Sequence, residues 1–570
     1  MYGIKKLREL ILELAVRGKL VPQDVNDEPA SVLLERIAAE KAQLVKEGKL
    51  KKQKPLPEIG EDEKPFELPN GWVWVRLNEA AEYNGRPNLD PNNITDNTWL
   101  LDLEDIEKDS SRLLYKAVYS ERESKSNKST FQKGDVLYGK LRPYLNKVII
   151  ADDDGVCTTE IVPIVPNEAV NAEYLKYLLK SPSFLNYVNS LMYGVKMPRL
   201  GTDDAIKSIH PIAPLKEQLR IVAKVDELMS LCDALETQTE ASIAAHQTLV
   251  ETLLNALIAE TSGKTAMDGV HATHSQNASA GAIFDRVAEH FDTLFTTEAS
   301  IDTLKQTILQ LAVMGKLVEQ ASCEARNSPN YEPAAKLLER IAKEKAQLIK
   351  DGKIKKQKPL PAITDEEKPF ELPKGWEWCY LQDITLLITD GKHGDCNNLD
   401  NSGFYFLSAK DIQNGKLIYD NARQIVESEF AEVHQRTNLE AGDICMVNTG
   451  ATVGKMAIAE EHSYTSKSTF QKSVAVIKVA NHYISNRYIA LFLESETPNL
   501  LKKSGGSAIN NLLLGDLKKK LSPLPPQEEQ HRIVAKVDEL MALCDQLKAR
   551  LSDAQTTQLH LTDAIVEQAI

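Results

Sequence analysis

The stretch RIVAKVDELMALCDQLKARLSDAQTTQLHLTDAIVEQAI (Arg532–Ile570) predicts one long amphipathic helix. Apolar or small residues recur in it at steps of three and four, with Gln558 as a polar break. These residues are Ile533, Val537, Leu540, Cys544, Leu547, Leu551, Ala554, Leu561 and Ile565. A single helix cannot bury such a stripe by itself, so the pattern predicts a coiled coil with a partner helix.

A near copy of this helix begins at Gln218. The segment QLRIVAKVDELMSLCDALE (Gln218–Glu236) aligns with the later helix without a gap, Ile221 against Ile533. Prolines precede both copies, as is typical of a segment that ends before a new helix starts. A duplicated helical bundle without a ligand would explain these helices, but it would not explain the segments between them.

Other parts of the chain are also present twice, in the same order. The repeated pairs are LRELILELAVRGKLV (7–21) with LKQTILQLAVMGKLV (304–318), LLERIAAEKAQLVKEGKLKKQKPLP (33–57) with LLERIAKEKAQLIKDGKIKKQKPLP (337–361), and KPFELPNGWVWVRL (64–77) with KPFELPKGWEWCYL (368–381). Two repeats of this length do not make a solenoid. They indicate a tandem duplication that folds into a pseudo-two-fold molecule.

Two blocks between the repeats differ strongly in sequence, but their skeletons agree. WLLDLEDI (99–106) aligns with FLSAKDI (406–412), and FQKGDVLYGKLRPYLNKVII (131–150) with LEAGDICMVNTGATVGKMAI (439–458). Such β-branched and aromatic runs, bounded by Gly and Asp, predict short strands joined by tight turns. In each block we expect an amphipathic helix next, then a polar loop; these segments are 173–191 and 194–200 in the first block, 486–503 and 506–512 in the second.

The predicted fold class is therefore α/β (α+β), with two mixed domains on one backbone plan and long repeated helices between them. The predicted segments are a helical region 1–75, a variable domain 76–212, a central helical region 213–375 with a flexible linker at 259–280, a variable domain 376–522 and a final coiled-coil helix 523–570. The terminal LTDAIVEQAI resembles LKQTILQLAV at Leu304, so we expect the two chain ends to meet and close a circular arrangement.

Composition narrows the classes of protein to consider. The 570 residues include no window near the ~20 apolar residues of a membrane span and no signal-peptide pattern at the start. The seven cysteines lack the spacing of a metal site or a redox pair, which favours a reducing cytoplasm. The formal charge of -14 argues against a uniformly basic nucleic-acid binder, but local basic surfaces remain compatible with it.

Motifs that could carry catalysis are weak. GATVGK (450–455) has three residues between its glycines and Met456 after the lysine, unlike a phosphate-binding loop. His393 in DGKHGD (390–395) lacks partners at metal-ligand spacing, so we interpret it as part of a polar turn. EDEK (61–64) and DEEK (365–368) have the carboxylates of a nuclease, but their place in a repeated linker favours solvated charge. No catalytic site is predicted.

Two lysine clusters, 46–54 and 350–358, each carry five lysines in nine residues. They are either soluble helix ends or contacts to DNA phosphates or to an acidic partner.

The arrangement resembles the specificity subunit of Type I restriction-modification enzymes. Each variable block opens with PxGWxW and is followed by PLKEQLRIVAKVDEL (214–228) or PPQEEQHRIVAKVDEL (525–540), and the resemblance covers essentially the whole chain. It implies two target-recognition domains that each read half of a split DNA sequence, spaced by an antiparallel coiled coil. The long segment before the first domain departs from shorter members, and it fits a circular permutation of the same unit.

The resemblance also implies partners and cofactors. The expected partners are double-stranded DNA, two modification (methyltransferase) subunits and restriction/translocase subunits. S-adenosylmethionine is expected on the modification subunits, which methylate adenine, and ATP and Mg on the restriction subunits. The chain itself is expected to be non-catalytic and to bind no cofactor.

Base reading requires side chains with directed hydrogen-bond donors on turns that can enter a groove. The predicted DNA-binding residues are Arg86, Lys140, Arg142, Lys147, Lys196 and Arg199 in the first domain, and Lys392, Ser408, Lys410, Asn448, Thr449, Lys455, Asn510 and Asn511 in the second. Lys147 and Lys455 align, so we expect both to contact phosphate. Trp72, Trp74, Trp376 and Trp378 are expected in the domain cores.

A rival hypothesis is a coiled-coil scaffold whose variable domains bind proteins. Co-purification with a methyltransferase and retention on duplex DNA distinguish the two hypotheses. An enzymatic role has the least support, and the DNA target itself is not readable from residue spacing.

Overall fold

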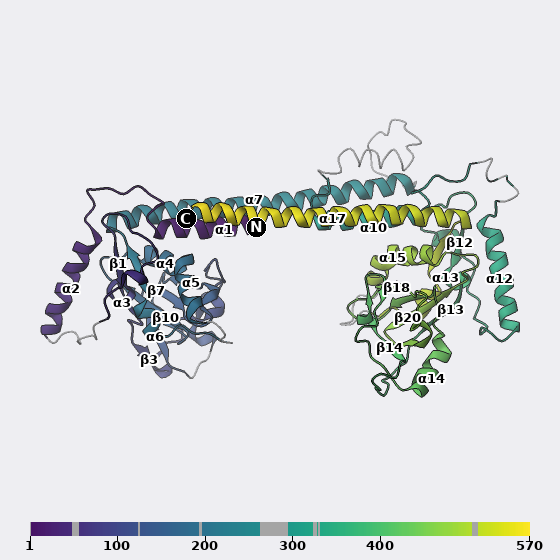
Figure 1. Ribbon diagram of the computed structural model, residues 1–570, viewed down its shortest axis with the longest axis horizontal. Helices are drawn as coiled ribbons and strands as arrows, with labels where there is room; N and C mark the ends of the chain where they lie inside the picture. Colours follow the sequence, from purple (N-terminus) through teal and green to yellow (C-terminus); the bar gives the residue numbers. More distant parts are fainter. Residues whose placement is uncertain are drawn as a thin grey trace. The chain divides into compact units, whose positions relative to one another are not determined.

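The computed structural model describes residues 2–47, 56–122, 126–192, 197–262, 294–322, 326, 328, 331–503 and 511–569. Its contacts divide the chain into two units, the first comprising residues 1–242 and 555–570 and the second residues 243–554. Each unit contains one of the variable domains (Figure 1). Among the described residues, no helix is both long and apolar enough to cross a membrane.

The first unit combines helices with short strands. Its helices are α1 (Tyr2–Val16), α2 (Ala30–Lys46), α3 (Leu77–Ala80), α4 (Ala172–Lys180), α5 (Pro182–Leu191), α6 (Thr202–Lys207) and the first part of α7 (Leu215–Ser262). Its strands are β1 (Val73–Arg76), β2 (Ala81–Tyr83), β3 (Asn88–Leu89), β4 (Trp99–Leu101), β5 (Ala117–Val118), β6 (Lys128–Phe131), β7 (Val136–Gly139), β8 (Val148–Ile150), β9 (Gly155–Cys157), β10 (Ile161–Pro166) and β11 (Ile209–Ile212). They form the sheets β1-β11, β2-β10-β7-β8 and β3-β6-β9-β4-β5.

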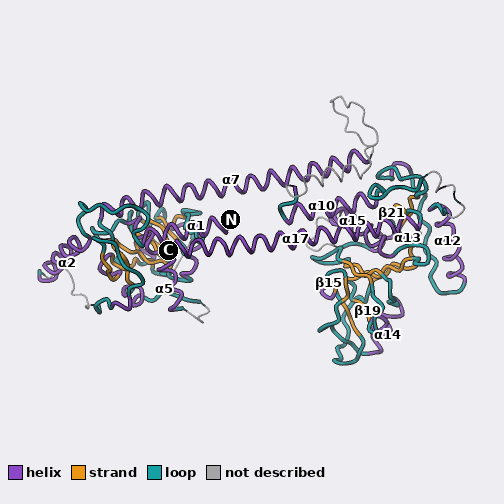
Figure 2. Tube along the Cα trace, turned by 45° about the horizontal axis from the view of Figure 1, so that its top comes forward, coloured by secondary structure: helices purple, strands orange, loops and turns teal. Residues whose placement is uncertain are grey.

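The second unit follows the same plan. Its helices are α10 (Glu298–Val313), α12 (Ala334–Lys350), α13 (Leu381–Ile384), α14 (Glu427–Thr437), α15 (Asn486–Lys503), α16 (Leu514–Lys518) and most of α17 (Gln527–Ala569). Its strands are β12 (Glu377–Tyr380), β13 (Thr385–Asp390), β14 (Tyr405–Leu407), β15 (Ile412–Gln413), β16 (Lys416–Leu417), β17 (Ile444–Val447), β18 (Met456–Ile458), β19 (Ser468–Phe470), β20 (Val474–Val479) and β21 (Leu521–Leu524). α14 packs beside β19 (Figure 2).

The central sheets of the two domains share one strand order. The order β2-β10-β7-β8 in the first unit matches β13-β20-β17-β18 in the second. The aligned sequences 131–150 and 439–458 supply the last two strands of each sheet, which are antiparallel in both cases. The prediction of mixed domains on a common backbone plan is therefore confirmed.

Two segments differ from the sequence-based expectation. The helix expected over 173–191 breaks at Ser181, whose side chain caps α5 by accepting a hydrogen bond from the Phe184 N–H, with Pro182 as the first helical residue. The linker expected at 259–280 is helical up to Ser262, because α7 continues that far. Its remaining residues lie outside the described part of the chain.

A buried glutamine fixes the start of each long helix to its own domain. Gln218 is fully buried; its Nε2 donates to the carbonyls of Ala169 and Ala213, at 2.8 Å each, and its Oε1 accepts from the Asn171 N–H at 2.8 Å. Ala169 and Asn171 lie in the loop before α4, and Ala213 lies in the turn before α7. Full satisfaction of a buried amide makes it a rigid connection.

The second unit repeats this connection. Gln530 is also fully buried; its Nε2 donates to the Pro525 carbonyl at 3.0 Å and its Oε1 accepts from the Ser485 N–H at 2.8 Å. The sequence Glu-Gln is repeated at the starts of α7 and α17, and in both copies the glutamine connects the helix to its domain.

Pairs of strands and a tyrosine complete the connection in each unit. The strand after PxGW pairs with the strand that leads into the long helix, Trp74 opposite Pro211 and Trp378 opposite Pro523. The carbonyls of these prolines accept hydrogen bonds from Tyr174 Oη at 2.9 Å and Tyr488 Oη at 2.8 Å. Of the predicted core tryptophans, Trp72 and Trp376 are buried, and Trp74 and Trp378 are half-buried.

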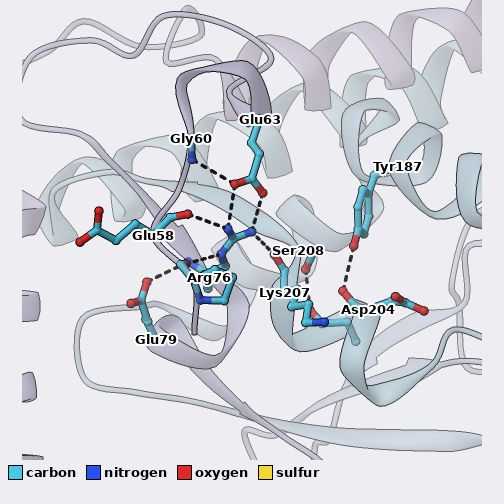
Figure 3. Close-up of polar contacts among 11 residues, drawn as sticks. Glu58, Gly60, Glu63, Arg76, Glu79, Tyr187, Asp204, Lys207 and Ser208 are labelled. Carbon is cyan, nitrogen blue, oxygen red and sulfur yellow. Dashed lines mark hydrogen bonds and ion pairs between the residues drawn. The ribbon is translucent and has the colours of Figure 1, made fainter. Parts of the chain in front are cut away.

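Arg76 ties the linker before the first domain to that domain (Figure 3). Its guanidinium is buried and donates to both carboxylate oxygens of Glu63, at 2.8 and 2.9 Å, and to the Lys207 carbonyl at 2.7 Å. The carbonyls of Pro57 and Glu58 accept two further bonds. Arg76 lowers the pKa of Glu63. Glu63 is therefore a structural partner, which fits the non-catalytic interpretation of the EDEK segment.

The two chain ends meet in the first unit, as predicted. Tyr2 Oη in α1 donates to Asp563 near the end of α17 at 2.8 Å, and Lys6 lies 3.7 Å from the same carboxylate. In the second unit the end of α7 has the equivalent place, since Val250 and Leu254 pack in one core with Ile301 of α10. Each unit thus includes the terminal part of the long helix that begins in the other.

Burial along the predicted coiled-coil stripe is uneven. Ile533, Val537 and Cys544 are buried and Leu540 is half-buried, whereas Leu561 and Ile565 are exposed. The first half of the stripe packs in the core of the second unit with α10. A coiled coil along the whole of α17 remains a prediction.

Replacing Gln218 by alanine tests the connection. The change removes three hydrogen bonds and leaves buried backbone groups unpaired, so we expect a loss of about 3 kcal/mol in the free energy of unfolding. Denaturant unfolding followed by tryptophan fluorescence measures it. Gln238→Ala, an exposed glutamine on the same helix, is the control, and equal losses in both variants would contradict the assignment.

Candidate functional site

A turn at the end of the central sheet lies beside a polar loop in the first unit. Turn 1, residues 140–147, connects β7 and β8. Leu141 pairs with Arg199, the Arg142 N–H donates to the Pro198 carbonyl at 2.8 Å, and the Leu200 N–H donates to the Lys140 carbonyl at 3.0 Å. Two segments with predicted DNA-binding residues, some 55 positions apart in sequence, therefore form one surface.

The second unit builds the same surface. Turn 2, residues 448–455, connects β17 and β18, and Thr449 in it pairs with Asn511. The Leu512 N–H donates to the Asn448 carbonyl at 2.8 Å, and Thr449 Oγ1 donates to Asn511 Oδ1 at 3.0 Å. The two domains thus present equivalent turns with different side chains.

The backbone of both turns visits the left-handed region at the same two positions. In turn 1 these positions are Arg142 and Asn146, with φ of 50° and 51°. In turn 2 they are Gly450 and Gly454, with φ of 111° and 94°. Glycine adopts this region freely, whereas an arginine there loses on the order of 1 kcal/mol. Turn 1 therefore carries a guanidinium at a position where the backbone favours glycine.

The predicted residues of the first domain are in different environments. Arg142 is exposed and Lys140 half-buried, and among the described residues neither side chain has a hydrogen-bonding or ion-pair partner. Arg199 forms an exposed ion pair with Glu160 at 3.0 Å. Lys147 Nζ donates to the Leu103 carbonyl at 2.7 Å, and burial lowers its pKa. Lys196 lies outside the described residues.

Arg86 has a structural partner. Its Nε and one terminal nitrogen donate to the two oxygens of the buried Asp135 carboxylate, at 2.7 and 2.8 Å. Asp135 also accepts from the Gln132 N–H at 2.8 Å. A guanidinium held in this way is not available to a base edge, so the geometry favours a role in folding for Arg86 over a DNA contact.

Of the predicted cations in the second domain, Lys455 and Lys410 are exposed, and no side-chain partner is found for either among the described residues. Lys392 lies between two glutamates, 3.6 Å from Glu429 and 3.3 Å from Glu432. The aligned pair Lys147 and Lys455 therefore differs: the first lysine is bound to a carbonyl, the second is open to solvent.

The polar predicted residues of the second domain have mixed roles. Ser408 caps a short 3-10 helix, and its Oγ donates to Asp411 at 2.9 Å. Asn448 is buried, with no partner for its Oδ1 among the described atoms. Asn511 is exposed, and Asn510 lies outside the described residues.

Two features of this surface were not predicted from the sequence. Tyr144, next to Arg142 in turn 1, exposes 48% of its surface. The other is a hairpin in each unit: Ile106 pairs with Leu113 beside turn 1, and Ile412 pairs with Leu417 beside β18, the strand that follows turn 2. The only signal for the first hairpin was the polar run EKDSSR (107–112), whereas the Asn414-Gly415 pair is a turn sequence typical of hairpins and indicates the second.

Other candidate chemistry gains no support. No group of three or more His, Cys, Asp or Glu able to hold a metal occurs among the described residues. His393 shares a hydrogen bond of 2.9 Å with Asp390 in an exposed turn. In the lysine cluster 350–358 all five lysines are exposed, while most of the cluster 46–54 lies outside the described residues.

Comparisons with known proteins agree on one family. The model of the Type I restriction modification DNA specificity domain matches residues 69–245 and 373–554. The chain is 42% identical over 593 aligned residues to the Type I restriction enzyme EcoAI specificity subunit of Escherichia coli, and 41% identical over 602 to the EcoEI specificity subunit of Escherichia coli; each alignment covers 100% of this chain and 94% of the relative.

A solved structure from work on assembly and conformational transition of the type I R-M system supports the fold. It aligns with a TM-score of 0.51 and 20% identity, over 89% of this chain and 99% of the other.

Replacing Arg86 by methionine tests the structural assignment. The change leaves the buried Asp135 carboxylate without its counter-charge, so we expect a loss of about 2–3 kcal/mol in unfolding free energy. Arg112→Met is the control, because Arg112 forms an exposed ion pair with Glu107, worth at most about 1 kcal/mol. The free energy of unfolding is measured with a denaturant. If Arg86→Met is as stable as the parent, the structural assignment is wrong and Arg86 is again a candidate for contact with DNA.

Proposed function

Because the chain belongs to the family of Type I restriction-modification specificity subunits, the subunits that recognise DNA, we propose that turns 1 and 2 each read one half of a split DNA target. In this proposal, turn 1 with the loop 197–200 serves one half-site, and turn 2 with Asn511 serves the other. The chain contributes recognition and no catalysis. Methyl transfer to adenine and DNA cleavage belong to partner subunits.

The observation that carries the proposal is the contrast between the two turns. Their backbones share strand connections, a pairing with a second loop and two left-handed positions, but turn 1 places Arg142 where turn 2 has Gly450. A constant backbone with divergent exposed side chains is what two readers of different sequences require. Arginine is the side chain that most often reads guanine, by two hydrogen bonds in the major groove.

Two lysines, the half-buried Lys140 and the exposed Lys455, complete the proposed interface. Lys140 in turn 1 and Lys455 in turn 2 are suited to neutralise phosphates, which position a protein on the duplex without specifying its sequence. Local cations of this kind suffice despite the negative charge of the whole chain, because binding depends on the charges near the DNA.

Assembly is part of the proposal. Two modification subunits that carry S-adenosylmethionine would bind this chain, and restriction subunits that use ATP and Mg would join them. The long helices are the proposed spacer. α7 is one continuous helix of 48 residues, and parts of it belong to both units, which supports a helix-determined gap between half-sites.

Arg142→Gly is the decisive variant. Relief of left-handed strain and the larger freedom of the unfolded chain oppose each other, so stability should change by less than about 1 kcal/mol. Loss of one specific base contact, about 1–3 kcal/mol, should reduce discrimination at one half-site by roughly 5- to 150-fold. The measurement is binding by the complex with its modification subunits to cognate DNA and to DNA altered in either half.

Asn146→Gly is the matched control, because it makes the same backbone change four residues later without removing a cation. Its target preference should equal that of the parent. Equal weakening at both half-sites by Arg142→Gly would contradict the modular assignment. Failure of the parent complex to be retained on duplex DNA would favour a protein-binding scaffold instead.

An insertion tests the spacer. Residues 237–241 of α7 are exposed, so four added residues there should be tolerated. Because four residues make about one helical turn, the apolar stripe after the insertion should keep nearly the same direction. They lengthen the helix by ~6 Å, against ~3.4 Å per base pair, so the gap should grow by one or two base pairs. Sequencing of methylated sites in cells reads out the gap.

Two further variants accompany this insertion. The same four residues at 549–553 of α17, combined with the first insertion, lengthen both long helices by the same amount. Four residues added at 353–356, an exposed non-helical segment, should leave the gap unchanged. An active α7 variant with the parental gap would show that the half-sites are spaced by another element.

A further inference from the structure

The hairpin 106–113 is bound to turn 1 by direct hydrogen bonds. The Asp109 N–H donates to the Leu145 carbonyl at 3.0 Å. Ser111 Oγ donates to the Asn146 carbonyl at 2.8 Å and accepts from the Val148 N–H at 3.1 Å. The tip of the hairpin therefore supports the backbone of turn 1 from one side.

This contact gathers backbone conformations that are unfavourable for residues with side chains. Asp109 and Ser111 have φ of 62° and 60°, and they lie against turn 1, where Arg142 and Asn146 also have positive φ. Asp and Asn tolerate this region better than other residues with side chains, but Ser111 and Arg142 each store on the order of 1 kcal/mol or more of strain, which persists only where the surroundings enforce it. Some group must hold these four conformations together.

Lys180, the last residue of α4, is that group. Its Nζ donates to the Asp109 carbonyl at 2.9 Å, the Ser110 carbonyl at 3.2 Å and Ser111 Oγ at 2.6 Å. An ammonium has three donors, and here all three are directed to the tip of the hairpin. The Lys180 carbonyl also accepts a hydrogen bond from Asn146 Nδ2 at 3.4 Å.

The second domain also has a hairpin with positive φ values at its tip, but no lysine at the aligned position holds it. Its hairpin, Ile412–Leu417, closes through Asn414 and Gly415, residue types that tolerate the positive φ found there, 50° and 75°. Lys180 follows Tyr174 by six positions, and Glu494 follows the equivalent Tyr488 by six, so an acidic residue occupies the aligned position. The lysine contact is specific to the first domain.

We propose that Lys180 is a positioning residue for DNA reading by the first domain: it holds the hairpin 106–113 against turn 1 and thereby fixes the direction of Arg142. The inference rests on the proposed function of turn 1. Lys180 itself touches no DNA in this account. It acts through the Ser111 hydroxyl and the backbone carbonyl of Asn146, which Asn146→Gly retains.

Removal of Lys180 is expected to affect position more than stability. Burial and, to a smaller extent, the nearby charge of Lys176 lower the pKa of Lys180 to about 8, although the Asp109 carboxylate opposes the shift. Keeping this ammonium charged in a partly buried place therefore costs free energy in the folded state. An apolar side chain of similar length escapes the penalty, which offsets part of the lost hydrogen bonding.

Lys180→Met, in the complex with its modification subunits, is the test. We expect about tenfold less discrimination at the half-site that Arg142→Gly weakens, and parental discrimination at the other. Lys176→Met is the control on the same helix, since Lys176 pairs with Glu173 and forms no hydrogen bond or ion pair with the described residues of the hairpin. Lys176→Met should read both half-sites as the parent does.

A rescue distinguishes positioning from a general structural role. Asp109→Gly relieves the left-handed strain at the tip of the hairpin and removes only an exposed ion pair with Lys5. Added to Lys180→Met, it should restore discrimination at least in part. A variant that had only lost stability would gain nothing from another glycine.

Hydrogen exchange gives a readout that does not depend on DNA. In Lys180→Met the amides of Asp109 and Val148 should exchange faster, while amides in the second domain should be unchanged. Unchanged exchange and unchanged discrimination in Lys180→Met, while Arg142→Gly still loses one half-site, would overturn this inference and leave the proposed function intact. Loss of effect in Arg142→Gly itself would instead remove the proposed function.

Discussion

The fold depends on a polar side chain that has no contact with water. Gln218 and Gln530 are fully buried at the starts of the long helices, and the loops of their own domains satisfy their amides. An apolar residue would fill the space but could not direct those backbone groups. The amide therefore determines both the direction in which each helix leaves its domain and the conformation of the loop before α4 or α15. This arrangement attaches the start of each long helix to its own domain.

Much of this architecture could be predicted from the sequence, because it is encoded locally or by repetition. The duplication, the strands around 131–150 and the meeting of the chain ends followed from aligned patterns. The break at Ser181 did not, because a Ser-Pro pair can also occur within a longer helical pattern and only the cap geometry decides. Helix 486–503, by contrast, continues through an internal Pro498.

The candidate site was less accessible to sequence reasoning, for a physical reason. Residue type indicated which side chains could contact DNA, but partners distant in sequence decide which remain free. Asp135 lies 49 positions after Arg86, and the carbonyl that binds Lys147 lies 44 positions before it. Lys455, aligned with Lys147, has no such partner in the described chain. Alignment transferred the backbone correctly between domains, but it did not transfer the local environment of each side chain.

The discontinuous first unit has a consequence for synthesis on the ribosome. Residues 1–242 emerge before the second unit, but the first unit also includes residues 555–570, which are translated after the second unit. The second unit is continuous and can complete itself in between. At ~5–20 residues per second, the intervening segment of about 310 residues imposes a delay of roughly 15–60 seconds. During that interval α1 lacks the contacts of Tyr2 and Lys6 with Asp563. Closure of the first unit therefore requires that synthesis has passed the second unit, and a product that stops before residue 555 lacks the segment that completes the first unit.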